Sequence, residues 1–204
     1  MKVIFLHGLG QDESSWKKVQ EALTDVPTES LALFPRGNES YQEIRQATLQ
    51  HLQAKNQPFL LVGLSLGGLL ALDLADQALP HLKGLILSGT QYNLADNFLY
   101  RLQIFVFKLI PKSVFNKQGA DKVQMLRILT GLRKVNLTEK VKKIKLPSLL
   151  VCGSKDKPNL KAAYKLNKLL KDSQLCIIEK GGHTLNSQAP EIFAQIIEKF
   201  LHEF

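Results

Sequence analysis

The chain has 204 residues, of which 45% are hydrophobic, and its formal net charge is +9. This length fits one domain, and the hydrophobic fraction is sufficient for a core. The N-terminal apolar run is too short for a signal peptide, and no apolar stretch reaches the roughly 18 residues of a membrane-spanning helix. Cys152 and Cys176 lie in strand-like runs that are typical of buried, reduced thiols, so we expect a cytoplasmic protein.

The positive charge is concentrated in one segment. Between Arg101 and Lys145, twelve Lys and Arg residues stand against only Asp121 and Glu139, which gives this segment a net charge of +10 and the rest of the chain −1. Such a segment can be a solvated surface, or it can attract anionic substrates, anionic lipid or nucleic acid. Because no nucleic-acid recognition motif accompanies the charge, we expect no nucleic-acid partner.

Short apolar runs alternate with helical patterns in the first half of the chain. Continuous apolar runs predict strands at 3–6, 31–34, 59–64 and 85–87. Apolar residues at helical spacing predict helices at 14–23, with Ser14 or Ser15 as the N-cap, at 41–52 and at 66–78. The last third repeats the alternation, with strands at 148–152 and 175–178 and helices at 160–170 and 192–200.

This alternation predicts an α/β fold. Strands that are apolar throughout are buried on both faces, and strand–helix alternation implies a mostly or wholly parallel sheet, here of about six strands in a three-layer structure. Residues 91–145 break the rhythm, because they are helical in pattern, rich in lysine and without a convincing strand. We therefore expect a core formed by 1–90 and 146–204, with 91–145 as a helical insertion.

A nucleophile elbow is predicted at Ser65. The sequence from Phe59 to Gly68 has the pattern strand, G-x-S-x-G, helix. The serine of such a turn has a strained backbone, and the positions two before and two after it need glycine, here Gly63 and Gly67. The turn also places the hydroxyl at a helix N-terminus, which favours developing negative charge.

A serine hydroxyl needs an adjacent base, and the base needs an orienting group. Asp156 and His183 each follow the end of a predicted strand, in the order serine, acid, histidine. An alternative for Asp156 is a turn or N-cap role, and His183 could be a surface loop residue. Glycines after the first strand would let the N–H of Leu9, with that of Leu66, form an oxyanion hole. This chemistry needs no metal or organic cofactor.

Four turns together carry a family resemblance: HGLG at 7–10, GLSLGG at 63–68, GSKD at 153–156 and GGH at 181–183. In this order they resemble the small, compact branch of the α/β-hydrolase superfamily, over essentially the whole chain. The resemblance implies a Ser-Asp-His triad and a parallel sheet in which the second strand lies at an edge beside the first, followed by the third to the sixth in chain order. It also implies that the antiparallel strand pair that opens larger members is missing.

In this superfamily the segment at 91–145 is commonly a cap over the nucleophile. Its run from Phe98 to Ile110 is apolar nearly all round, so a helix there must bury more than one face. Three interpretations stay open: packing within the cap, an acyl-chain pocket lined by Phe105, Phe107 or Leu109, and interfacial contact with a membrane.

The sequence thus predicts a serine hydrolase that cleaves carboxylic esters through an acyl-enzyme on Ser65. The expected partner is a small ester or thioester with an apolar acyl group, and peripheral membrane contact through the basic cap is a further option. A thioesterase, lipase-like hydrolase or acyltransferase would use the same triad. A non-catalytic ligand-binding protein or a membrane-surface protein on the same fold is the alternative from another class.

Overall fold

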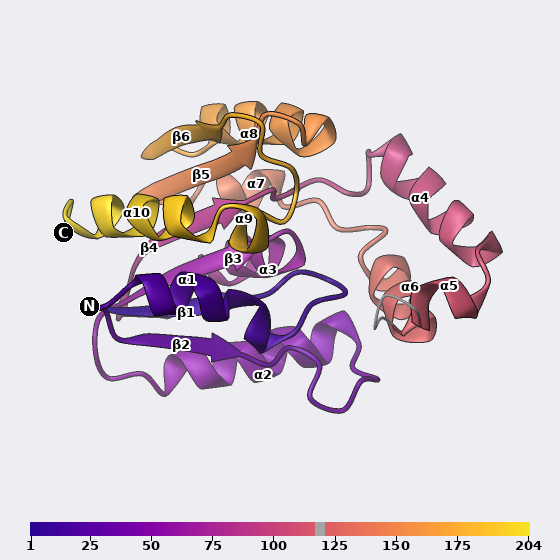
Figure 1. Cartoon of the computed structure of the whole chain (residues 1–204), viewed down its shortest axis with the longest axis horizontal. Coiled ribbons are helices and arrows are strands. Elements are labelled where there is room, and N and C mark those ends of the chain that lie inside the picture. Colours follow the sequence, from indigo (N-terminus) through magenta and orange to yellow (C-terminus); the bar gives the residue numbers. More distant parts are fainter. Residues whose placement is uncertain (117–120) are drawn as a thin grey trace.

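In the computed structural model, six parallel strands form one sheet in the order β2-β1-β3-β4-β5-β6 (Figure 1). The structure describes residues 1–116 and 121–204, except for the side chains of Leu99, Gln103 and Asn116. The strands are β1 (Lys2–Leu6), β2 (Thr28–Leu31), β3 (Phe59–Leu64), β4 (Leu82–Ser88), β5 (Ser148–Gly153) and β6 (Ser173–Ile178). The predicted fold class and strand order are confirmed.

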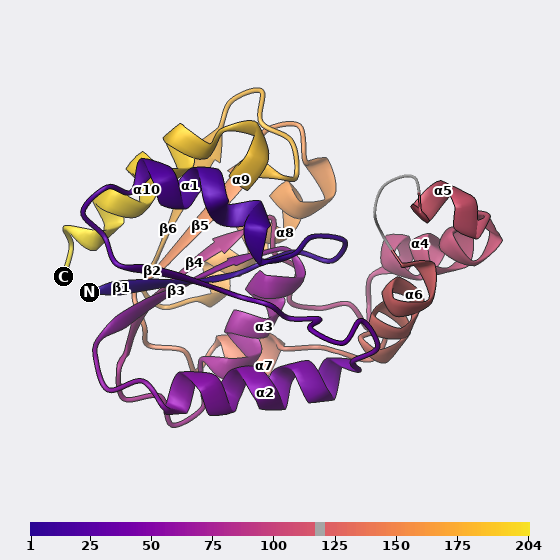
Figure 2. The same cartoon turned by 60° about the horizontal axis from the view of Figure 1, so that its bottom comes forward.

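Helices cover both faces of the sheet and complete the three layers (Figure 2). One face carries the 3₁₀ helix η1 (Glu13–Trp16), α1 (Lys17–Ala22), α9 (Leu185–Gln188) and α10 (Pro190–Leu201). The other carries α2 (Tyr41–Gln53), α3 (Leu66–Leu74), α7 (Thr138–Val141) and α8 (Lys157–Leu169). Successive strand residues alternate between the two layers: Ile4 and Leu6 pack on the α2–α3 side, and Val3 and Phe5 on the α1–α10 side.

Two elements predicted in the first 34 residues differ in the structure. The second strand is Thr28–Leu31 and not 31–34, because a half-buried edge strand does not need a continuous apolar sequence. The apolar run that predicted a strand continues beyond β2, where Leu33 is buried outside the strand. Its N–H donates to Nε2 of His7 at 3.1 Å. The helix predicted at 14–23 is split into η1 and α1, and the N-cap is Asp12, whose carboxylate accepts from the Ser14 N–H at 2.9 Å.

The long apolar helix was predicted to reach residue 78, but α3 ends at Leu74. Its length is set by packing, since every residue from Leu66 to Leu74 is buried. The buried Asp73 accepts hydrogen bonds from Tyr41, Arg45 and Lys140, and these fasten α2 and α7 to α3. After Leu74 the chain turns back toward β4.

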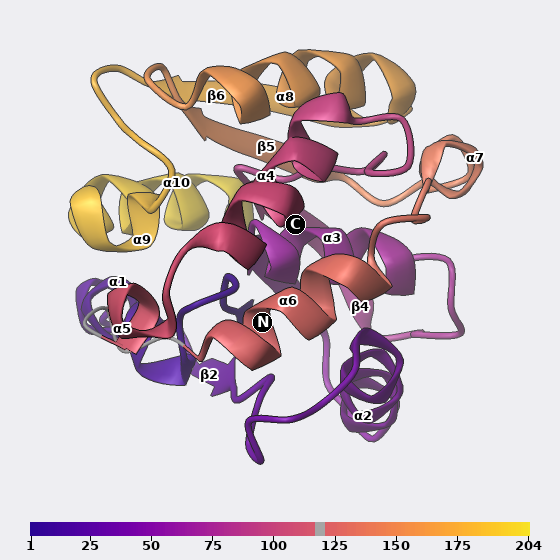
Figure 3. The same ribbon diagram turned by 90° about the vertical axis from the view of Figure 1, so that its right-hand side faces the viewer.

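Between β4 and β5 the chain leaves the sheet and forms α4 (Phe98–Leu109), α5 (Lys112–Asn116) and α6 (Lys122–Gly131), which stand together at one end of the molecule (Figures 1 and 3). Residues 117–120 of the predicted insertion, with Lys117 of its basic set, lie outside the described residues. The division of the chain at 91 and 145 stays a prediction. No helix within the described ranges is long and apolar enough to cross a membrane.

Candidate active site

Ser65 lies in a strained turn between β3 and α3. Its φ of 53° and ψ of −108° are outside the regions that L-residues favour, and its N–H donates to the Ser88 carbonyl at 2.8 Å. The flanking glycines make the turn possible: a Cβ on Gly63 would come within 2.5 Å of the Gly67 backbone, and one on Gly67 within 2.2 Å of the Leu6 carbonyl oxygen. The structure thus places Ser65 at the helix N-terminus, as the sequence predicted.

Asp156 and His183 form a hydrogen-bonded pair beyond the ends of β5 and β6. Nδ1 of His183 lies 2.6 Å from Oδ2 of Asp156. The Asp156 side chain is only 8% exposed, whereas that of His183 is 41% exposed. Since Nδ1 is occupied by the carboxylate, Nε2 is the nitrogen left for a reacting group. Asp156 is thus more than a cap for α8, and its side chain makes no capping bond to that helix.

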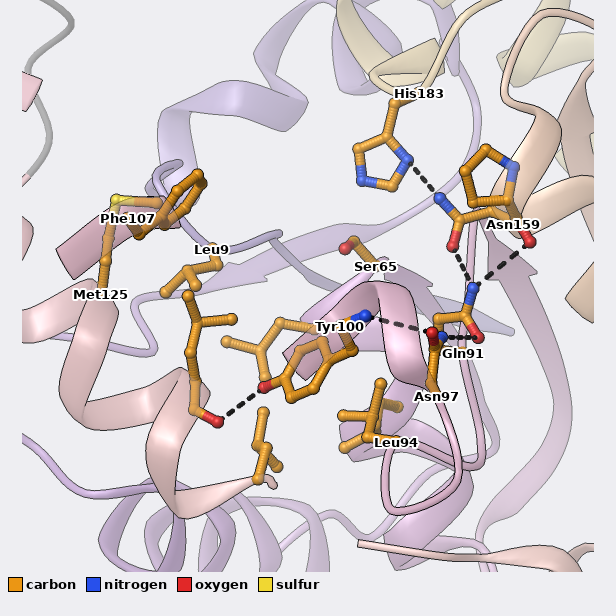
Figure 4. A pocket seen from close by; sticks show the side chains of 15 residues that line it. Leu9, Ser65, Gln91, Leu94, Asn97, Tyr100, Phe107, Met125, Asn159 and His183 are labelled. Atoms are coloured by element: carbon orange, nitrogen blue, oxygen red, sulfur yellow. Dashed lines mark hydrogen bonds between the residues drawn. The ribbon is translucent and has the colours of Figure 1, made fainter. Parts of the chain in front are cut away.

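A chain of amide side chains joins this pair to α4, and Figure 4 shows the part that runs from His183 through Asn159 and Gln91 to Asn97. Nδ2 of Asn159 lies 2.8 and 2.9 Å from the two carboxylate oxygens of Asp156 and 3.2 Å from Nδ1 of His183. Oδ1 of Asn159 accepts from Nε2 of Gln91 at 2.8 Å. Gln91 in turn accepts from Asn97 at 3.5 Å, and the Asn97 side chain caps α4 through the Tyr100 N–H. Asn159 therefore holds the carboxylate in place with a donor of its own.

Gly89 makes room for the acid–histidine pair. It follows β4 with a φ of +53°, and its N–H donates to the Val151 carbonyl at 3.1 Å. A Cβ at this position would lie 2.9 Å from Nδ1 of His183 and 3.3 Å from Oδ2 of Asp156. Both the backbone conformation and the space therefore require glycine here.

Two backbone N–H groups, those of Leu9 and Leu66, belong to residues that line the same cavity as Ser65. Neither the Leu9 nor the Leu66 N–H donates a hydrogen bond within the described part of the chain. The loop that carries Leu9 is fixed from within, because the Gly8 N–H donates to Oε1 of Gln11 at 3.1 Å, and Nδ1 of His7 bonds the Gly8 carbonyl at 2.9 Å. Burial lowers the pKa of His7, which suits a neutral ring that accepts from Leu33.

A cavity of about 480 Å³ opens beside Ser65 and His183 (Figure 4). Leu9 and Leu66 line it from the loop after β1 and from α3, and the segment between β4 and β5 contributes apolar side chains: Leu94, Tyr100, Phe107, Met125, Leu129 and Leu132. Burial raises the pKa of Tyr100, whose hydroxyl donates to the Leu129 carbonyl at 2.8 Å. None of the described residues that line the cavity is Lys, Arg, Asp or Glu.

Of the three aromatic and aliphatic residues predicted for an acyl pocket, only Phe107 lines this cavity. Phe105 and Leu109 lie on the opposite face of α4 and are 59% and 69% exposed, so that part of the prediction was wrong. Because the helix is apolar on nearly all sides, its sequence does not indicate which face packs inward. No group of three His, Cys, Asp or Glu side chains among residues 1–116 and 121–204 could hold a metal.

Sequence reasoning also missed Gly89, Gln91 and Asn159. A signal existed for Gly89, since a glycine directly after a buried strand marks the carboxyl edge of the sheet where the site lies. Asn159 stands three residues after Asp156, a spacing that reads as an ordinary first turn of a helix. The hydrogen bond from Gln91 to Asn159 joins positions that are 68 apart in the sequence, and no local pattern predicts it.

Comparisons with known proteins identify relatives of this chain. The model of the alpha/beta hydrolase family matches residues 3–196. A putative 2-succinyl-6-hydroxy-2,4-cyclohexadiene-1-carboxylate synthase of Bacillus subtilis (strain 168) is 26% identical over 98% of this chain and 89% of the relative. A protein of the same description from Haemophilus influenzae is also 26% identical, over 97% of this chain and 96% of the relative.

Solved structures share the fold. MenH from S. aureus superposes with a TM-score of 0.77 at 22% identity, covering 100% of this chain and 94% of that one. A thermophilic esterase from Thermogutta terrifontis gives a TM-score of 0.79 at 20% identity, with 100% and 90% coverage.

Proposed function

Because the chain belongs to the alpha/beta hydrolase family, we propose that it is a serine hydrolase that cleaves carboxylic esters with an apolar acyl group. Ser65 is the nucleophile, His183 the general base and acid, and Asp156 the group that orients His183. The observation that carries this proposal is the hydrogen-bonded Asp156–His183 pair, which lies with Ser65 beside an uncharged, largely apolar cavity.

The proposed reaction has two stages. Oγ of Ser65 attacks the ester carbonyl carbon while Nε2 of His183 takes the hydroxyl proton, and the N–H groups of Leu9 and Leu66 bind the oxyanion. The tetrahedral intermediate expels the alcohol, which takes the proton from His183. Water then attacks the acyl-enzyme with its proton passing to His183, and the carboxylic acid leaves as Ser65 recovers its proton. Asp156 stabilises the imidazolium in both stages.

The lining of the cavity supports an apolar acyl group. Six apolar cap side chains and Leu69 of α3 surround it, and burial of hydrocarbon against such a wall is worth about 0.8 kcal/mol per CH₂. We therefore expect kcat/KM to rise along a series of p-nitrophenyl esters from acetate until the acyl chain fills the cavity. A matched thioester series separates an esterase from a thioesterase.

The decisive experiment combines this series with Ser65→Ala and a fluorophosphonate probe. The variant should lose turnover and labelling while its circular dichroism spectrum is unchanged. Full activity of Ser65→Ala would refute the mechanism, and failure of the wild-type protein to react with the probe would favour a ligand-binding protein on this fold. Asp156→Asn should be impaired by about 10³-fold or more, as in other triads.

A second candidate is the synthase reaction after which the Bacillus subtilis and Haemophilus influenzae relatives are described. Their similarity over nearly the whole chain favours it. The named product carries a carboxylate and a succinyl group, both anionic, and a site for it would be expected to hold Lys or Arg. The described cavity lining has neither, which favours the neutral ester. Incubation with the synthase substrate, followed by the absorbance of the cyclohexadiene product, decides between the two.

A further inference from the structure

Helix α4 has two apolar faces, and among the described residues only one of them packs against the rest of the molecule. Tyr100 and Ile104 are buried on the inner face, and Phe107 on the same side lines the cavity. The outer face carries five further apolar side chains with exposed fractions from 42% to 73%. These residues form the outer stripe: Phe98, Leu102, Phe105, Val106 and Leu109.

The outer stripe is continuous. At about 100° per residue, its five side chains project within an arc of about 100°, opposite Tyr100 and Phe107. Figure 3 looks onto the end of the molecule at which α4 stands, with α5 and α6 beside it. Val114 of α5 and Val123 of α6 are also exposed, at 43% and 50%. An exposed apolar surface of this extent on a single chain marks an interaction site.

Positive charge borders the outer stripe. Arg101 and Lys108 are exposed, lie seven residues apart and share one edge of it, and the exposed Lys112 follows at the start of α5. The sequence from Phe98 to Asn116 contains no acidic residue. The nearest acidic residue along the chain beyond α5 is Asp121, whose carboxylate is engaged in capping α6.

From this combination we propose that the outer stripe of α4 binds the surface of an anionic membrane, with the helix lying in the plane of the interface. An apolar face edged by Lys and Arg is the pattern of interfacial helices. At 1.5 Å per residue α4 is about 18 Å long, too short to span a bilayer and suited to lying flat. A second copy of the chain fits less well, because a symmetric contact would bring two segments of net charge +10 together.

The inner face of α4 gives this contact a consequence for the site. Tyr100 and Phe107 line the cavity from the same helix whose other face meets the lipid. An acyl chain leaving the membrane would therefore have only one helix between it and the cavity. This part of the inference rests on the proposed function, whereas membrane binding itself does not.

Co-sedimentation with vesicles tests the proposal. Ser65→Ala protein is mixed with phosphatidylcholine vesicles with or without phosphatidylglycerol, at low salt and at about 0.5 M salt, where charges are screened beyond a few ångströms. We expect binding to the anionic vesicles that weakens with salt. Phe98→Ser/Leu102→Ser should reduce the partition coefficient by about tenfold or more, and Lys108→Glu by about fivefold or more. Because co-sedimentation needs no turnover, the outcome is independent of the proposed hydrolysis.

The matched controls are Tyr164→Ser and Lys165→Glu on α8, which are exposed in the same way on the body of the molecule. They should bind as the parent does. The proposal is overturned if the parent does not bind anionic vesicles at low salt, or if the control variants lose binding equally. It is also overturned if Phe98→Ser/Leu102→Ser, folded by circular dichroism, still binds in full. A dimer that these substitutions dissociate, without vesicle binding, would assign the stripe to a second copy.

Discussion

Gly89→Ala should damage the site more than the fold. The added methyl carbon would lie 2.9 Å from Nδ1 of His183, and ordinary contact begins at 3.4 Å, so the ring must move by about 0.5 Å. A displacement of about 1 Å costs on the order of 100-fold in rate. We therefore expect kcat/KM on an activated ester to fall by about 10- to 100-fold. Urea denaturation should show a loss of about 1–2 kcal/mol from the left-handed backbone.

Gly37→Ala is the matched control. Gly37 has a φ of +71°, so alanine there carries the same backbone penalty, but its Cβ would meet nothing within 4 Å. This variant should lose a similar free energy of unfolding, equivalent to about 2–4 °C in Tm per kcal/mol, and keep full activity. Equal activity of Gly37→Ala and Gly89→Ala would refute the steric reasoning.

Three further predictions concern other parts of the molecule. Asn159→Ala should lower kcat by about tenfold with little effect on KM, because Asp156 loses its amide donor while the apolar side chains that line the cavity are unchanged; steady-state kinetics checks this. Glu29 has a pKa of about 2: burial would raise it, but hydrogen bonds, first from Lys55, outweigh burial. The wild type should therefore exceed Glu29→Gln in stability by about 1 kcal/mol above pH 4.5, a margin lost toward pH 2, as urea titrations across pH will test. Phe193→Ala should cost about 3–5 kcal/mol in the same assay, because its side chain is fully buried between η1 and the sheet.

The central strands could be predicted from sequence because strands that are buried on both faces consist mainly of apolar residues. Every residue of β3 and β5 is buried, so apolar runs and strands coincide. At the edge of the sheet, strand residues are only half-buried and need not be apolar. The second strand was therefore predicted three residues late, at an apolar run whose buried residue Leu33 lies outside β2. Burial alone thus predicts a strand only where both faces are covered.

The site divides in the same way. Ser65 could be predicted because its turn requires glycine two residues before it and two residues after it. A steric requirement at such fixed positions is visible in the local sequence. The contacts of Asn159 with Asp156 and Gln91 depend on how α8 and the loop after β4 meet in space. The facing of Phe105 away from the cavity depends on how α4 rolls against α6.

The amide chain from Asn97 through Gln91 and Asn159 means that hydrogen bonds link the start of α4 to Asp156. Thermodynamic reciprocity then sets a condition on the molecule. If a ligand on α4 raises the affinity of the site for an inhibitor, that same inhibitor must raise the affinity of α4 for the ligand by the same factor. The affinity of α4 for its ligand and the affinity of the site for the inhibitor would then change together, because the same four side chains link the two places.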